Sequence, residues 1–307
     1  MPVLKSIFMV TIVVLNAEQA EQDYRQHLGY ETVGKGALST GLASAWGLPA
    51  MAGAAYVLMQ AKAPSPNLLR FIEAAEPGNY QPLRTQGWNA VEILVEDAEA
   101  LARSLAPSPF EVIGPPRFLT EQRNIKALQA LGPAGELLYL TQVLDPTQTS
   151  FRIGSAQAWV DRVFIMVLGT TDLAATTRFY TGVLAQEISG PWPYRIGVLS
   201  RAWDQPEDRV YPLSVVQLQG QYLVEIDEYP PEAARRDRPA GGLPFGPAMV
   251  TFEVGSLAEA AERLAMRPGA VPDPPYAGRE LLVVEGPSGE WLELIGPEPV
   301  AAGDQTP

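Results

Sequence analysis

Residues 132–136 read Gly-Pro-Ala-Gly-Glu, and residues 286–290 read Gly-Pro-Ser-Gly-Glu. The two motifs lie 154 positions apart (286 − 132 = 154). A second pair keeps nearly the same offset, because Tyr24 and Tyr180 are 156 positions apart (180 − 24 = 156). Such a nearly constant offset between unlike motifs indicates that the chain consists of two similar halves.

The segments around the tyrosines define a smaller unit within each half. The apolar run from Phe8 to Leu15 is typical of a strand, and Asn16 then begins a helical pattern that ends at Gly29. The same order of strand and helix recurs from Val163, and again from Val91 and from Val250. Short apolar runs separated by Gly and Pro follow each helix and predict antiparallel strands. The chain is therefore predicted to contain four strand-helix-strand-strand-strand modules.

Domain boundaries follow from this repeat and from the polar stretch that begins at Asp145. We predict a first domain of two modules at residues 1–144, a linker at 145–158, a second domain of two modules at 159–297 and a flexible tail at 298–307. The sequence leaves open whether modules pair within each half, across the halves or between subunits. It therefore leaves the oligomeric state open as well, a homodimer included.

Composition excludes several classes of partner. The net charge of −13 disfavours binding to nucleic acid or to an anionic membrane surface, and the chain has no cysteine. The apolar run near the N-terminus imitates a secretory signal, but its counterpart in mid-chain indicates a strand, and we expect a cytoplasmic protein. The Arg235-Arg236-Asp237-Arg238 cluster is interpreted as a solvated loop. Motifs for nucleotide binding and serine hydrolysis are absent from the sequence.

The four modules, the helix residues Phe179-Tyr180 and Leu184, and the Gly-Pro-x-Gly-Glu motif before a final Leu-Glu-Leu strand carry a family resemblance. Together they resemble the vicinal oxygen chelate superfamily, which contains glyoxalase I, bleomycin-resistance proteins and extradiol dioxygenases. The resemblance covers residues from about 5 to 297 and is most specific from Gly286 to Ile295. It implies an α+β fold in which four βαβββ modules pair into two curved, partly open barrel-like sheets. Each sheet would enclose a ligand-binding cup.

The resemblance also implies a divalent metal in a cup, held by His, Glu or Gln from the first and last strands of paired modules. The aligned positions are Arg70, Tyr139, Glu225 and Glu293 on last strands, and Thr11, Asn89, Arg162 and Ala248 on first strands. Only the two glutamates are ordinary ligands, so neither a metal nor another cofactor is expected. The only histidine, His27, falls on the flank of a helix and is interpreted as a surface or structural residue.

Within such cups the same alignment suggests chemical roles. Glu293, Glu225 and Tyr139 are candidate proton-transfer residues. Candidate substrate-binding residues are the polar Arg162, Arg70 and Asn89 and the aromatic Trp46, Trp88 and Trp203. Structural readings compete with these, since Arg162 would equally well pair with the glutamates and Trp46 would equally well cover a barrel end. Tyr24 and Tyr180 are interpreted as helix-packing residues.

Three functions remain open from the sequence. The first is a metal-independent lyase or isomerase that moves protons on a small oxygenated apolar or aromatic metabolite. The second is a protein that binds a drug or metabolite without turnover. The third is an atypical glyoxalase-like enzyme whose divalent metal is held by Glu225, Glu293 and neutral oxygen ligands.

Overall fold

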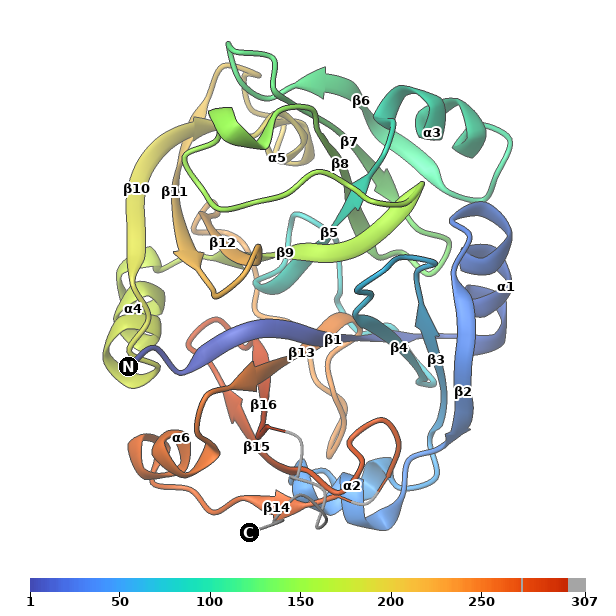
Figure 1. Cartoon of the computed structure of the whole chain (residues 1–307), viewed down its shortest axis with the longest axis vertical. Coiled ribbons are helices and arrows are strands. Elements are labelled where there is room, and N and C mark those ends of the chain that lie inside the picture. Colours follow the sequence, from blue (N-terminus) through green and yellow to red (C-terminus); the bar gives the residue numbers. More distant parts are fainter. Residues whose placement is uncertain (272, 298–307) are drawn as a thin grey trace, which may run out of the picture.

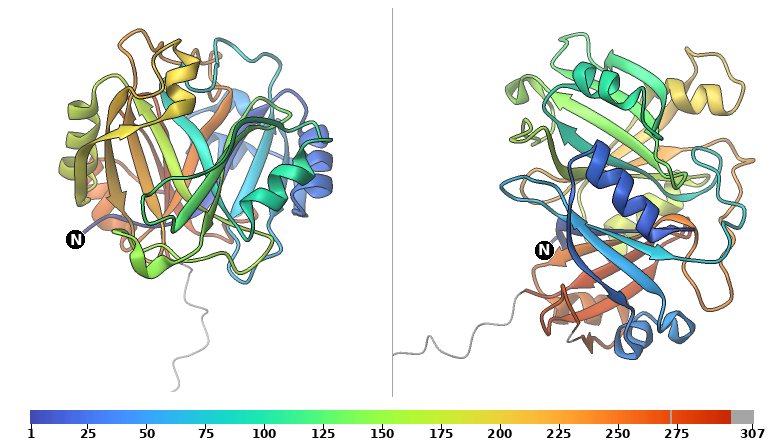
Figure 2. Two further views of the ribbon diagram at one scale, coloured as in Figure 1. Left: turned by 90° about the horizontal axis from the view of Figure 1, so that it is seen from above. Right: turned by 90° about the vertical axis from the view of Figure 1, so that its right-hand side faces the viewer.

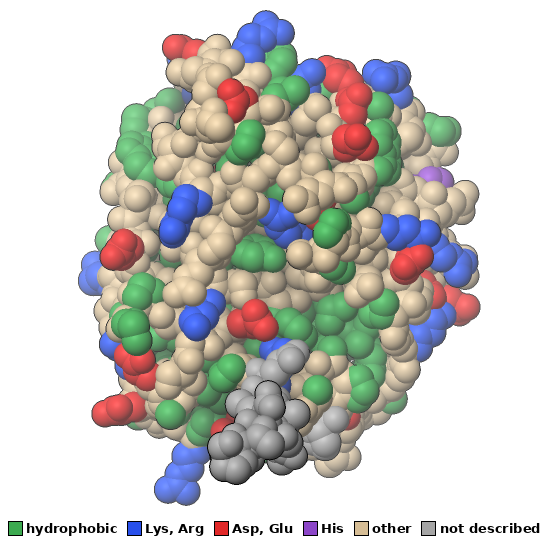
Figure 3. Space-filling model, viewed as in Figure 1, with side chains coloured by type: hydrophobic (Ala, Val, Ile, Leu, Met, Phe, Trp, Pro, Cys, Tyr) green, Lys and Arg blue, Asp and Glu red, His purple; other side chains and the backbone are tan. Residues whose placement is uncertain are grey.

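The computed structural model describes residues 1–271 and 273–297, and it has the predicted α+β fold. Four βαβββ modules follow one another along the chain. The tail that was predicted to be flexible, 298–307, lies outside the described residues. Within the described part of the chain, no helix combines the length and the apolarity needed to cross a bilayer. On the face seen in Figure 3, acidic and basic side chains are interspersed.

The first two modules have these elements. Module 1 contains β1 (Leu4–Val14), α1 (Ala17–His27), β2 (Glu31–Ala37), α2 (Thr40–Ala45), a 3₁₀ turn (Pro49–Met51), β3 (Ala55–Gln60) and β4 (Leu68–Glu73). Module 2 contains β5 (Gly87–Val95), α3 (Ala98–Leu105), β6 (Glu111–Phe118), β7 (Ile125–Leu131) and β8 (Leu137–Val143). A 3₁₀ turn (Pro146–Gln148) lies in the predicted linker.

The last two modules repeat the pattern. Module 3 contains β9 (Val160–Thr170), α4 (Leu173–Arg178) continued by a π-helical turn (Phe179–Val183), β10 (Ile188–Arg195), α5 (Gly197–Ala202), β11 (Val210–Gln217) and β12 (Leu223–Glu228). Module 4 contains β13 (Gly246–Val254), α6 (Leu257–Leu264), β14 (Gly269–Ala270), β15 (Glu280–Glu285) and β16 (Trp291–Ile295). Asn16 begins α1 as predicted, since its side chain accepts a hydrogen bond from the backbone of Gln19, and Ser256 caps α6 in the same way through the backbone of Glu259.

The modules pair across the halves of the chain. One sheet has the order β14-β15-β16-β13-β1-β4-β3-β2 and joins modules 1 and 4, and we call it the terminal sheet. The other has the order β10-β11-β12-β9-β5-β8-β7-β6 and joins modules 2 and 3, and we call it the central sheet. Each sheet therefore combines a module from residues 1–144 with one from 159–297, instead of following the division at the linker. Figure 1 shows the central sheet above the terminal sheet.

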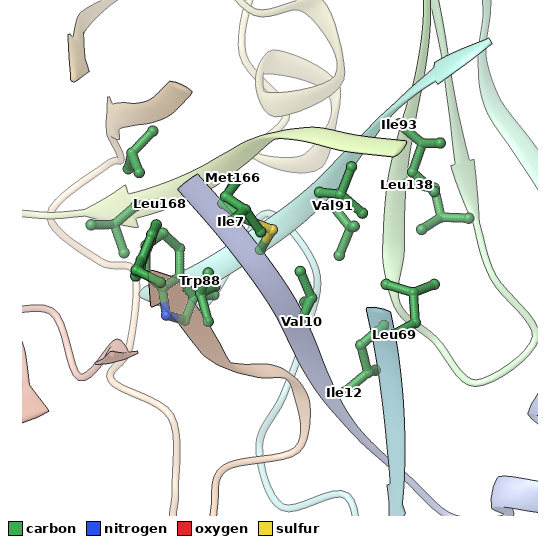
Figure 4. Packing of buried hydrophobic residues seen from close by; sticks show 14 of the residues in the cluster. Ile7, Val10, Ile12, Leu69, Trp88, Val91, Ile93, Leu138, Met166 and Leu168 are labelled. Carbon is green, nitrogen blue, oxygen red and sulfur yellow. The ribbon is translucent and has the colours of Figure 1, made fainter. Parts of the chain in front are cut away.

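The two sheets pack against each other through the faces that turn away from their own cups. Ile7, Val10 and Ile12 of β1 lie in one apolar cluster with Trp88 of β5 and Met166 of β9 (Figure 4). Helices α1, α3, α4 and α6 lie at the flanks of this sandwich (Figures 1 and 2). Each concave face has an apolar cluster of its own, which we call the terminal cup and the central cup.

The Gly-Pro-x-Gly-Glu motifs form the turns that begin β8 and β16. In the first motif, the Glu136 side chain folds back so closely over Gly132 that a Cβ at that glycine would lie 1.8 Å from the carboxyl oxygen Oε1. Oε2 accepts a hydrogen bond from the backbone of Ala134, and Oε1 accepts one from the hydroxyl of Tyr24 at 2.7 Å. Because Tyr24 belongs to module 1 and Glu136 to module 2, this bond ties the two sheets together. Tyr24 is thus a structural residue, as the sequence suggested.

Candidate functional site

In each module the first and last strands are parallel neighbours. Their pairing places one residue of each strand side by side on the face that lines a cup. The four pairs are Thr11 with Arg70, Glu92 with Tyr139, Val167 with Glu225, and Thr251 with Glu293. All four expected last-strand residues hold these positions.

The first-strand expectation was wrong at three of the four positions. Glu92, Val167 and Thr251 stand where Asn89, Arg162 and Ala248 were expected, whereas Thr11 was placed correctly. These first strands are long and almost uniformly buried, and β5 carries register shifts against β9, so the sequence contained no marker of the register.

A closed polar network fills the terminal cup. The carboxylate of Glu293 accepts hydrogen bonds from Trp46 Nε1 at 2.6 Å, from Thr251 Oγ1 at 2.6 Å and from the hydroxyl of Tyr276 at 2.8 and 2.9 Å. The guanidinium of Arg70 lies 3.8 Å from this carboxylate and donates to Thr11 and to Tyr276. Helix α2 carries Trp46 into the cup at its C-terminal end, where the indole stacks 4.6 Å from the guanidinium carbon of Arg70.

This network does not fit the metal that the fold family implies. The only carboxylate among the four register positions of the terminal cup is Glu293, and it is already bonded to three donors. The positive charge of Arg70 occupies the position beside it, and both side chains are almost fully buried, at 1% and 0% exposure. A second cation next to this guanidinium would be repelled. The terminal cup is therefore a charge-neutralised, buried part of the core.

The central cup has the opposite electrostatic character. Glu92 of β5 and Glu225 and Asp227 of β12 share its concave face with the phenol of Tyr139 on β8. Glu92 accepts a hydrogen bond from Thr141 at 2.6 Å. Among the described residues, no basic side chain forms an ion pair with any of these three acids. Oδ1 of Asp227 and the hydroxyl of Tyr139 are buried without a hydrogen-bond partner in that part of the chain.

The environment of these acids raises their pKa values. Burial, and secondarily the charge of Glu225, raises the pKa of Glu92 to about 8. Burial also raises the pKa of Glu225 to about 7, although a hydrogen bond with Asp227 acts in the opposite direction. The pKa of Asp227 is raised well above its usual range by burial and by the charges of Glu225 and Glu92. Burial likewise raises the pKa of Tyr139. At neutral pH these three groups are thus protonated to a larger extent than ordinary carboxyl groups, and Glu225, with a pKa of about 7, is the one closest to its midpoint.

Solvent reaches the edge of this acidic cluster. Glu225 and Gln129 are both partly exposed, and Gln129 lies opposite Tyr139 in the pairing of β7 with β8. Helix α5 closes the mouth between the two edge strands, because Arg201 donates to the carbonyl of Ile113 on β6 at 3.1 Å. Tyr194 of β10 makes a similar link to the end of β6. Helix α5 thus covers the central cup, and the side chains of Glu225 and Gln129 are partly exposed at its edge.

A transition metal fits the central cup no better than the terminal cup. One of its four register positions is Val167, which has no donor atom, and another is a phenol. No group of three or more His, Cys, Asp or Glu side chains in residues 1–271 and 273–297 has an arrangement that could hold a metal ion. Glu225 and Glu293 belong to different sheets, so the metal site that would use both of them is wrong.

Several predicted site residues lie outside both cup networks. Arg162 pairs with Asp161 and donates to Gln221, so the expected pairing with Glu225 or Glu293 is not formed. Asn89 is bonded to the backbone of Leu83 and to Tyr229.

The other aromatic and basic candidates are held by contacts of their own. Trp88 lies between the two sheets, where its indole donates to the carbonyl of Trp291. Trp203 donates to the carbonyl of Leu83 and packs against the central cup cluster. His27 contacts Phe110 outside the cups. Arg236 is not solvated as predicted, because its guanidinium binds the carbonyls of Trp88, Phe245 and Pro247.

The chain has the fold of the vicinal oxygen chelate superfamily, as comparison with solved structures shows. Glyoxalase I from Zea mays superimposes with a TM-score of 0.63 and 12% identity, over 95% of this chain and 92% of that one. A proposed dioxygenase from Bacillus subtilis also gives a TM-score of 0.63 and 12% identity, over 100% and 89% of the two chains. No family model and no curated protein sequence matches the chain.

Proposed function

We propose that the chain is a metal-independent lyase or isomerase that transfers protons on a small, oxygenated, apolar or aromatic metabolite in the central cup. The observation that carries the proposal is a group of three acids, the buried Glu92 and Asp227 and the partly exposed Glu225, beside the phenol of Tyr139, whose hydroxyl has no hydrogen-bond partner in the described part of the chain. Buried acids without a counterion are costly to a fold, and they are concentrated at sites of proton transfer. The lack of cysteine is compatible with the cytoplasm, where we place the protein.

The raised pKa values assign different roles to the acids. Glu225 has the lower pKa of the two glutamates and is partly exposed, so it is the group that ionises near neutral pH and removes a proton from a carbon next to a carbonyl. Glu92 keeps its proton to higher pH and donates a hydrogen bond, or the proton itself, to the carbonyl oxygen. Tyr139 supplies a second donor to that oxygen. Glu225 then returns the proton to the neighbouring carbon, and Glu92 takes a proton back from the hydroxyl group that becomes the new carbonyl, which completes the isomerisation.

The alternative function is binding without turnover, and one observation favours it. Val198 and Leu199 of α5 belong to the apolar cluster of the central cup, so the helix that covers the cup also forms part of its lining. A lining of this kind suits retention of an apolar guest. The two functions differ in whether a bound compound exchanges its protons with solvent.

Deuterium exchange tests the proposal with 2-hydroxyacetophenone as the probe. The compound is incubated with the protein in D₂O, and loss of the hydrogens between its ketone and hydroxyl groups is followed by NMR. We expect exchange above the buffer rate that persists in EDTA. The Glu225→Gln variant should lower the rate by about 100-fold or more, because general acid–base groups typically contribute on the order of 10²–10⁴-fold.

The control is Glu187→Gln, which removes an exposed carboxylate from the same module and should leave the rate unchanged. An unchanged rate in Glu225→Gln, loss of exchange in EDTA, or the absence of any protein-dependent exchange would each contradict the proposal. Retained binding of the probe without exchange would favour the binding function.

A further inference from the structure

Among the described residues, the central cup holds carboxyl groups but no opposing charge. The causes that shift the pKa values of Glu92, Glu225 and Asp227 are burial, hydrogen bonds and the other acids, and no cation offsets them. The terminal cup provides the contrast within the same chain, since its carboxylate, Glu293, has the guanidinium of Arg70 as a partner. In the terminal cup a side chain of the protein itself supplies the counterion. In the central cup no described side chain supplies a positive charge to the acids.

A second observation, independent of the acids, points to a ligand at the same place. The Tyr139 side chain is 7% exposed, and its hydroxyl has no hydrogen-bond partner in the described part of the chain. The charges of Asp227, Glu225 and Glu92 contribute to the raised pKa of the phenol, so the phenol lies next to the acidic cluster. A buried hydroxyl in a folded protein normally has a partner, and here a bound molecule would provide one.

The rest of the cup is apolar. Its walls include Ile165, Val167, Leu213, Val215 and Tyr211 from β9 and β11. These side chains suit a hydrocarbon or aromatic body, whereas the acids at the floor suit a group that donates hydrogen bonds and carries positive charge.

We propose that the ligand of the central cup is a protonated amine with an apolar or aromatic body, and that its ammonium group binds among Glu92, Glu225 and Asp227. This inference rests on the proposed function, because it assigns the substrate class of the same site. The ammonium group supplies the missing counterion and donates to the free carboxyl oxygen of Asp227. The carbonyl or hydroxyl oxygen of the ligand accepts the free proton of Tyr139. The overall negative charge of the protein also favours the approach of a cation.

Two arginines near the mouth define the competing possibility. Arg201 and Arg117 approach the same residue at the start of α5, Gly197, and an anionic ligand would be held there. Arg201 already donates to the carbonyl of Ile113 and contacts Glu207. An anion that reached the cup floor would meet three acids, so we favour the amine.

Three benzyl compounds of nearly equal size separate these charges. Binding of benzylamine, benzyl alcohol and benzoate to the full chain is measured by isothermal titration calorimetry at neutral pH. We expect benzylamine to bind at least about ten-fold more tightly than benzyl alcohol, the lower end of what charge-assisted hydrogen bonds contribute, and benzoate to bind more weakly than the alcohol. The Glu225→Gln variant should reduce the preference for benzylamine to less than about three-fold. The Glu187→Gln control should retain it.

Equal or tighter binding of benzyl alcohol or benzoate, or no binding of any of the three compounds, would overturn the inference. Asp227→Asn serves as a second variant, and circular dichroism of each variant shows whether it is folded. The outcome is distinguishable from failure of the proposed function. If exchange depends on Glu225 but the amine is not preferred, only the assignment of an amine ligand is contradicted. If the amine binds but no exchange occurs, only the proposed proton transfer is contradicted.

Discussion

The buried ion pair of the terminal cup permits a quantitative test of its structural role. In the Arg70→Met variant, Glu293 would keep its three neutral donors but lose the guanidinium beside it. Breaking a buried pair by removing one partner costs about 3–5 kcal/mol, because the remaining charge stays buried without compensation. Since Arg70 is 1% exposed and Glu293 0% exposed, solvent cannot screen the remaining charge. We expect a loss of about 3–5 kcal/mol in the free energy of unfolding.

Urea unfolding followed by circular dichroism measures this loss. The double variant Arg70→Met/Glu293→Gln removes both charges, so its loss should be smaller than the sum of the single losses by about 2 kcal/mol or more. Arg84→Met is the matched control, because Arg84 and Asp204 form an exposed pair of a kind that contributes about 0–1 kcal/mol. A change of less than about 0.5 kcal/mol in Arg70→Met, or strictly additive losses, would refute a structural role for this pair.

Two further predictions concern the Tyr-Glu positions of the repeat. Burial raises the pKa of Glu136 to about 7 and that of Glu290 to about 8. The folded chain then binds more protons than the unfolded chain. The stability that these two groups contribute is therefore complete below pH ~4.5 and is lost as the pH rises through 7 and 8. Urea unfolding between pH 5 and 9 should show this decline in the free energy of unfolding. The decline should be shallower in Glu136→Gln, and a flat profile in the parent protein would contradict it. Tyr24→Phe should lower the free energy of unfolding by about 1–3 kcal/mol, because the Tyr24 hydroxyl is hydrogen-bonded to the buried Glu136. Tyr180→Phe should change it by less than about 0.5 kcal/mol, because the Tyr180 hydroxyl has no hydrogen-bond partner among the described residues. Equal losses in the two variants would argue against the inter-sheet bond.

The sequence alone was sufficient to predict the four modules and the residues that line the cups from the last strand of each module. The Gly-Pro-x-Gly-Glu turn places Tyr139 and Glu293 three residues after its glutamate, and the following strands begin where the turn ends. Positive φ angles of 85° at Gly135 and 79° at Gly289 explain why the turn needs that glycine in both halves. A rigid local motif thus fixed the register of β8 and β16.

The first strands and the pairing of modules lacked such a motif. Asn89 and Glu92 both lie on β5, every residue of which is buried, so polarity alone did not distinguish the cup position. Glu92 was therefore missed, and so was Tyr276, which follows a loop whose path no periodicity indicates. Modules with the same local pattern pair equally well within or across halves, and only tertiary packing decides between them. Tyr24 and Glu136 both recur in the second half of the sequence, as Tyr180 and Glu290, but the repeat did not indicate that Tyr24 and Glu136 form a hydrogen bond.

The central claim is that the acids of the central cup have raised pKa values and no counterion among the described residues. Carbon NMR of the protein labelled with ¹³C at glutamate carboxyl groups tests it most directly. Resonances assigned by their loss in Glu92→Gln and Glu225→Gln should titrate near pH 8 and pH 7, respectively. Midpoints below about pH 5 for both carboxyl groups, close to that of an ordinary glutamate, would contradict the claim.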